Sequence, residues 1–137
     1  MFINPTPDQI RSLLQAVRSI AVVGLSPKPD RPSYRVARGM QGFGYRILPV
    51  RPAISEVLGE KAWPDLQSLP ERPDLVDVFR APSEVGPVVD ACIRLGVPYL
   101  WLQEGVINEA EALRAQAAGI TVVMDRCIWR DYLEFCT

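Results

Sequence analysis

The sequence contains no histidine, and this absence restricts its chemistry more than any residue that is present. Histidine is the commonest general base and the commonest metal ligand in proteins. Without it, phosphohistidine chemistry is excluded as well. We therefore predict no catalytic residue and no metal ion for this chain.

Cysteine is scarce, and long apolar runs are missing. The three cysteines, Cys92, Cys127 and Cys136, are widely spaced and form no CxxC pair, so neither a disulfide framework nor a zinc site is predicted. No apolar run approaches the ~20 residues that cross a bilayer, and the N-terminal stretch MFINPTPDQI lacks the basic and apolar regions of a signal peptide. We expect a cytoplasmic protein with no membrane partner.

An excess of charge of one sign is also missing. The chain has 15 Lys and Arg against 16 Asp and Glu, which gives a net charge of -1. This balance argues against a nucleic-acid partner. Apolar residues make up 48% of the 137 positions, enough to bury a core without disulfides. With no linker or repeat, we predict a single domain over residues 1–137.

The most informative stretch is residues 20–36. The apolar run Ile20–Val23 ends at Gly24, and a proline-rich loop then leads to Ser33, which we expect to be a helix N-cap. In a parallel α/β sheet, this first crossover lies at the carboxyl edge, where ligands carrying phosphate bind. The stretch also carries hydroxyl and cationic side chains suited to an anion: Ser26, Lys28, Arg31, Ser33 and Arg35. An ordinary loop with solvated basic residues is the alternative interpretation.

Helical and strand patterns alternate along the whole chain. Thr6 and Gln9 fit a capping box. Asn108 is expected to cap a helix that turns Ala110, Leu113 and Ala117 toward the sheet. Helices are expected over residues 7–18, 33–42, 83–95, 108–119 and 128–137, and strands over 20–23, 45–50, 75–79, 98–102 and 120–124. The alternation predicts a three-layer, Rossmann-like, doubly wound parallel sheet of about five strands in the order 3-2-1-4-5.

The carboxyl ends of these strands would form one crevice. Nicotinamide-binding folds end their second strand in an acidic residue, but here Arg51 occupies that place. A cation there suits a ligand with a phosphate on its adenosine ribose, such as NADP or coenzyme A, although a solvated arginine explains the residue equally well. The next glycine after Gly24 is Gly39, so the GxGxxG fingerprint of a standard NAD site is missing.

Several consecutive motifs resemble a known family. These stretches are VVGLSPKPDRPSYRVA, GYRILPVRP, LGEKAWPDL, DLVDVFRAP, LWLQEGVINEAEA and VVMDRC. From about Thr6 to Cys127 the chain resembles the small stand-alone CoA-binding proteins, relatives of the CoA-binding domain in the α subunit of succinyl-CoA synthetase. The resemblance implies that coenzyme A or an acyl-CoA is the ligand.

The resemblance also implies contacts from the loop after the first strand, the turns after the second and third strands, and the far end of the crevice. The positions it implies are Gly24, Leu25, Ser26, Lys28, Val50, Arg51, Pro52, Phe79, Arg80, Pro82, Gln103, Glu104, Gly105 and Cys127. Arg31, Ser33 and Tyr34, from the loop and the helix that follows it, complete the predicted site.

The departures from the synthetase favour a binding or regulatory module over an enzyme. The synthetase uses a second α-subunit domain with a phosphorylated histidine and a β subunit, and these 137 residues contain neither that domain nor a histidine. The alternatives are an enzyme that depends on NADP or on the CoA thiol, and a regulatory subunit of an acyl-CoA ligase or transferase. Homodimers formed through edge helices are common among such sheets, but no sequence feature identifies a contact patch.

Two residues leave a chemical role open. Cys127 fits a mixed disulfide with the coenzyme thiol, but isolated cysteines are more often small buried hydrophobes. Glu104 fits a general base, and equally a carboxylate that orients a ligand amide or caps a helix.

Overall fold

The computed structural model describes all residues from Met1 to Thr137. The helices are α1 Pro7–Ala16, α2 Pro32–Gly42, α3 Val85–Leu95, α4 Glu109–Ala117 and α5 Ile128–Phe135, with 3-10 turns η1 Leu66–Ser68 and η2 Pro82–Glu84. The strands are β1 Ser19–Val23, β2 Arg46–Val50, β3 Glu56–Val57, β4 Glu60–Lys61, β5 Leu75–Val78, β6 Tyr99–Leu102 and β7 Thr121–Met124. None of the helices has the length and apolar character needed to span a bilayer.

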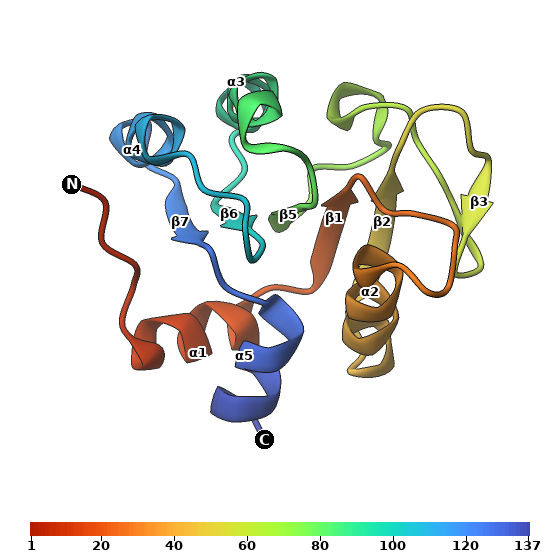
Figure 1. The fold of residues 1–137 in the computed structure, drawn as a ribbon, viewed down its shortest axis with the longest axis horizontal. Helices are drawn as coiled ribbons and strands as arrows, with labels where there is room; N and C mark the ends of the chain where they lie inside the picture. Colours follow the sequence, from red (N-terminus) through yellow and green to blue (C-terminus); the bar gives the residue numbers. More distant parts are fainter.

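Five parallel strands form the central sheet in the order β2-β1-β5-β6-β7, and β3 and β4 form a separate antiparallel hairpin. Helices α3 and α4 cover one face of the sheet, and α1, α2 and α5 cover the other (Figure 1). Each face has its own cluster of buried apolar side chains, because strand residues alternate between the faces. The predicted three-layer Rossmann-like fold is confirmed.

The sheet follows the 3-2-1-4-5 winding, with its third position reduced to a single residue. Beyond β2, Trp63 forms an isolated parallel bridge with Val50, at the place where this winding puts a third strand. The segment 75–79, numbered third along the sequence, provides β5 and lies beside β1 instead. The third position of the winding belongs to Trp63, which comes before this segment in the chain, and the segment itself takes the fourth position.

Two of the three helix caps predicted from the sequence are present. The capping box is present, with the Thr6 side chain accepting from Gln9 N–H and the Gln9 side chain accepting from Thr6 N–H. Asn108 caps α4 as expected. The prediction that Ser33 is an N-cap is wrong: Arg31 occupies that position, because Pro32 takes the first helical place that suits proline.

The predicted inner face of α4 is also wrong. Ala112 and Ala115 are buried against the sheet, whereas Ala110, Leu113 and Ala117 are exposed. Small residues on the buried face bring the helix close to its neighbours, and the larger leucine points outward.

Candidate functional site

The tips of β1, β2 and β5 meet at Gly24. Its φ of +86° lies in the left-handed region, which favours glycine. Gly24 N–H donates to Val50 O at 2.9 Å, and a Cβ atom on Gly24 would lie only 2.5 Å from Phe79 O. Any side chain at this position would therefore separate strand ends that are now in close contact.

The loop after β1 is held by its own serines. Ser26 N–H donates to Ser33 Oγ at 2.9 Å, and Lys28 N–H donates to Ser26 Oγ at 3.1 Å. Both serines are buried, and each hydroxyl retains its own hydrogen to donate. In the first turn of α2, the Ser33 and Tyr34 amides donate to no backbone acceptor. The loop thus offers hydrogen-bond donors at the positive end of a helix.

A hollow of about 400 Å³, here called the cationic hollow, opens beside this loop. It is lined by Gly24, Ser26, Pro27, Lys28, Arg31, Pro32, Ser33, Arg51, Ile54 and Phe79. Its cations Lys28, Arg31 and Arg51 form no ion pair within the protein. Their charges are consequently available to an anion.

Arg51 is placed by backbone contacts between the end of β2 and Trp63. Its N–H donates to Trp63 O at 2.8 Å, and Trp63 N–H donates to Pro49 O at 2.9 Å. The Lys61 ammonium lies 4.3 Å from the centre of the Trp63 ring, a cation-π distance. The turn that carries Arg51 is thereby held against the sheet, while the guanidinium itself is free.

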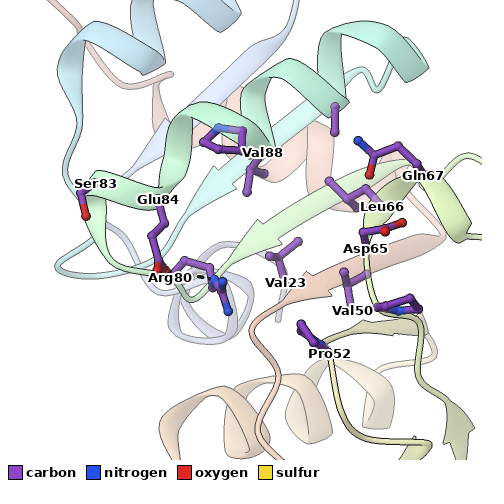
Figure 2. Close-up of a pocket in the computed structure, with 13 residues that line it drawn as sticks. Val23, Val50, Pro52, Asp65, Leu66, Gln67, Arg80, Ser83, Glu84 and Val88 are labelled. Carbon is purple, nitrogen blue, oxygen red and sulfur yellow. Dashed lines mark ion pairs between the residues drawn. The ribbon is translucent and has the colours of Figure 1, made fainter.

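A second hollow of about 380 Å³, here called the apolar hollow, lies between η1 and α3 (Figure 2). Its lining residues are Val23, Val50, Pro52, Pro64, Asp65, Leu66, Gln67, Arg80, Ser83, Glu84, Pro87, Val88 and Ala91. The two hollows share the tips of β1, β2 and β5, because the consecutive pairs Val23–Gly24, Val50–Arg51 and Phe79–Arg80 each contribute one residue to either side. They are neighbouring compartments of one crevice.

The tips of β6 and β7 are occupied by contacts within the protein. Gln103 is buried, and its Oε1 accepts from Ile128 N–H at 3.0 Å, where α5 begins. Asp125 Oδ1 accepts from Gly105 N–H at 2.9 Å. Glu104 pairs with Arg130 at 2.8 Å. Gln103 and Glu104 thus join the tip of β6 to α5, and Asp125 joins the tips of β6 and β7. None of these groups lines either hollow.

The start of α5 is fixed by an ion pair between a buried carboxylate, Asp131, and a partly exposed guanidinium, Arg126. Arg126 Nε donates to Asp131 Oδ2 at 2.6 Å and its terminal nitrogen donates to Oδ1 at 2.9 Å. This bidentate contact raises the pKa of Arg126 above its ordinary value. Cys127, at the N-cap of α5, is buried in the apolar cluster on that face of the sheet and lines neither hollow.

Asp77, in the central strand β5, is a buried carboxyl without a charged partner. Asp77 sits in β5 between Val22 of β1 and Trp101 of β6, and its Oδ1 has no hydrogen-bond partner. Burial raises the pKa of Asp77 well above its ordinary value, so the neutral form is favoured. The residue is 1% exposed and lines neither hollow.

A family model described as a CoA binding domain matches residues 18–132. The chain belongs to this CoA-binding family. YneT of Bacillus subtilis, described as uncharacterized, is 41% identical over 125 residues, which cover 91% of this chain and 93% of YneT. A hypothetical protein from Pyrococcus horikoshii has a similar structure, with a TM-score of 0.94, 31% identity and coverage of 100% of this chain and 99% of that one.

A larger enzyme contains a related segment. The ADP-forming acetate–CoA ligase II of Archaeoglobus fulgidus is 28% identical over 83 residues, which cover 58% of this CoA-binding-family chain but 12% of the ligase. The similarity therefore concerns a small part of that enzyme. The resemblance to CoA-binding proteins that the motifs indicate is confirmed at the level of the family.

The structure brings ten of the predicted site residues of this CoA-binding-family protein to the two hollows. They are Gly24, Ser26, Lys28, Arg31, Ser33, Arg51 and Phe79 in the cationic hollow, and Val50, Pro52 and Arg80 in the apolar hollow. The other predicted positions line neither: Leu25, Tyr34, Pro82, Gln103, Glu104, Gly105 and Cys127. Leu25 is wholly buried in the core.

Sequence reasoning missed the outer wall of the apolar hollow. That wall consists of Pro64, Asp65, Leu66 and Gln67 on one side and Ser83, Glu84, Pro87, Val88 and Ala91 on the other. Asp65 Oδ1 accepts from Ser68 N–H at the start of η1. The position of η1 beside β2 depends on the bridge between Trp63 and Val50, which no local sequence pattern predicts.

Proposed function

We propose that this CoA-binding-family protein binds coenzyme A or an acyl-CoA across the two hollows, as a binding or regulatory module without catalytic activity of its own. The observation that carries the proposal is the cationic hollow. There, Lys28, Arg31 and Arg51 have no anionic partner and lie beside unused amides at the start of α2.

The chemistry of coenzyme A matches both compartments. Its pyrophosphate and ribose 3′-phosphate need cations and hydrogen-bond donors, which the cationic hollow offers. Its adenine needs a largely apolar slot with a few polar groups, a description that fits Val23, Val50 and Val88 with Asp65 and Gln67 at the rim. We place the phosphates beside Arg51 and Lys28, and the adenine in the apolar hollow.

The groups around the hollows favour binding over catalysis. Asp65 Oδ1 accepts from Ser68 N–H, and Glu84 pairs with Arg80. Asp77 and Cys127 lie outside both hollows. No serine that lines the hollows is hydrogen-bonded to a carboxylate or a lysine, which is the arrangement that activates a nucleophile for covalent catalysis.

Isothermal titration of the reduced protein with CoA, acetyl-CoA, dephospho-CoA and NADP tests the proposal. We expect CoA and acetyl-CoA to bind, and removal of the 3′-phosphate to weaken binding about tenfold or more, because a charge-assisted hydrogen bond is lost. NADP is included because it also carries a ribose phosphate. Preference for NADP, a hydride-transfer cofactor, would favour an oxidoreductase instead. Absence of binding to all four ligands would contradict the proposal.

A further inference from the structure

The strand tips at Gly24, Arg51 and Phe79 form a ridge between the two hollows, and Arg80 lies on this ridge. Its Cδ is 3.1 Å from where a Cβ on Gly24 would be, so the side chain crosses the end of β1. Its guanidinium lines the apolar hollow, and Nε lies 3.2 Å from Glu84 Oε2 (Figure 2). Arg80 thus differs from Lys28, Arg31 and Arg51, which form no ion pair within the protein.

The carboxylate of Glu84 has one polar contact within the protein, and that contact is Arg80. It ends the turn η2 and occupies the N-cap position of α3, yet its side chain caps no helix amide. The carboxylate lines the apolar hollow with 51% of its side chain exposed, and the side chain of Arg80 is 39% exposed. An ion pair between such exposed groups is weak, so a phosphate group can replace it.

We propose that Glu84 restrains Arg80 in the free protein, and that an anionic ligand spanning both hollows draws Arg80 away from Glu84 to one of its own phosphates. The inference rests on the proposed function, because it assumes a nucleotide whose phosphates cross the ridge at Gly24. It makes Glu84 a residue that lowers the affinity for such ligands, and a determinant that sequence reasoning did not identify.

The restraint acts through the population of free Arg80. If only a fraction of the molecules present an unpaired guanidinium, the apparent affinity falls by that fraction. The worth of an exposed ion pair limits the effect to about two- to fivefold. The Glu84→Gln substitution removes the charge at constant size, and should raise the affinity for CoA by that factor.

A double-mutant cycle with CoA at low ionic strength tests the restraint. We expect Glu84→Gln to bind CoA about two- to fivefold more tightly than the unmodified protein, and Arg80→Met to bind at least about fivefold more weakly. In the Arg80→Met background, Glu84→Gln should have no effect. Glu71→Gln is the matched control, because it breaks the exposed Arg46–Glu71 pair at 2.7 Å, whose residues line neither hollow.

The possible outcomes separate this inference from the proposed function. If the unmodified protein binds CoA and Glu84→Gln binds no more tightly, the restraint is wrong and the function stands. An equal gain in the Arg80→Met background would also overturn it, since removal of a negative charge alone would then explain the gain. If the unmodified protein does not bind CoA, both proposals fail. Circular dichroism of each variant verifies the fold.

Discussion

The carboxyl edge of the sheet carries polar side chains at both of its ends and uses them differently. At the near end, where β1, β2 and β5 finish, Lys28, Arg31 and Arg51 have no ion-pair partner in the protein. At the far end, where β6 and β7 finish, Gln103 and Glu104 are bound to α5. A polar residue at a strand tip can thus serve a ligand or a neighbouring helix.

The path of the chain explains this difference. After β7 the chain turns into α5, which packs on α1 and α2, and the start of that helix must be joined to the sheet. Gln103 and Asp131 provide the joints. After β1, by contrast, the chain leaves the sheet through a loop held by Ser26 and Ser33, and the cations beside this loop form no ion pair within the protein. The near end remains open because no closing helix uses its polar groups.

At the far end, loss of the Arg126–Asp131 ion pair should lower the stability of the protein. Asp131→Ala removes the buried carboxylate that binds the Arg126 guanidinium through two hydrogen bonds, and leaves that guanidinium unpaired. We expect the free energy of unfolding to fall by about 2 to 3 kcal/mol, less than for a fully buried pair because Arg126 is partly exposed. Denaturant unfolding measures the loss. CoA affinity of the folded variant should not change, and a parallel loss of affinity would contradict the separation of the two ends.

The near end should fail in binding instead. Arg51→Ala removes a cation that has no partner in the protein, so we expect CoA affinity to fall by about 1 to 3 kcal/mol, roughly 5- to 150-fold. The free energy of unfolding should change by less than about 0.5 kcal/mol, as for other surface substitutions. Calorimetry with CoA gives the affinity, and Arg46→Ala at the opposite end of β2 is the control. Unchanged affinity in a folded variant would remove Arg51 from the site.

The fold could be predicted further than the site. Alternating apolar strands and capped helices are local features, so the capping box at Thr6 and the helix cap at Asn108 could be read directly from the sequence. Positions that depend on distant contacts could not. Ser33 has the chemistry of an N-cap, but its hydroxyl accepts from Ser26 N–H while Pro32 begins the helix. Trp63 takes the outer place in the sheet through a single bridge.

In the site, sequence reasoning found the charges but not their partners. The rule that parallel strands end at one edge placed Gly24, Arg51 and Arg80 together, as the structure does. It could not distinguish the free guanidinium of Arg51 from that of Arg80, which Glu84 holds. Nor could it tell that Gln103 is bound to the start of α5, because such pairings form between segments far apart in the chain.

The smallest effect is expected at the far end, from the ion pair between Glu104 and Arg130. Glu104 and Arg130 form an exposed pair at 2.8 Å, with 54% and 66% of their side chains accessible. Such pairs contribute about 0 to 1 kcal/mol, so Glu104→Gln should hardly alter unfolding. We expect CoA affinity within about twofold of the unmodified protein, because Arg130 already occupies this carboxylate. A tenfold loss in calorimetry would instead extend the ligand to the far tips, where the resemblance places Gln103, Glu104 and Gly105, and the far end would then bind ligand as well as α5.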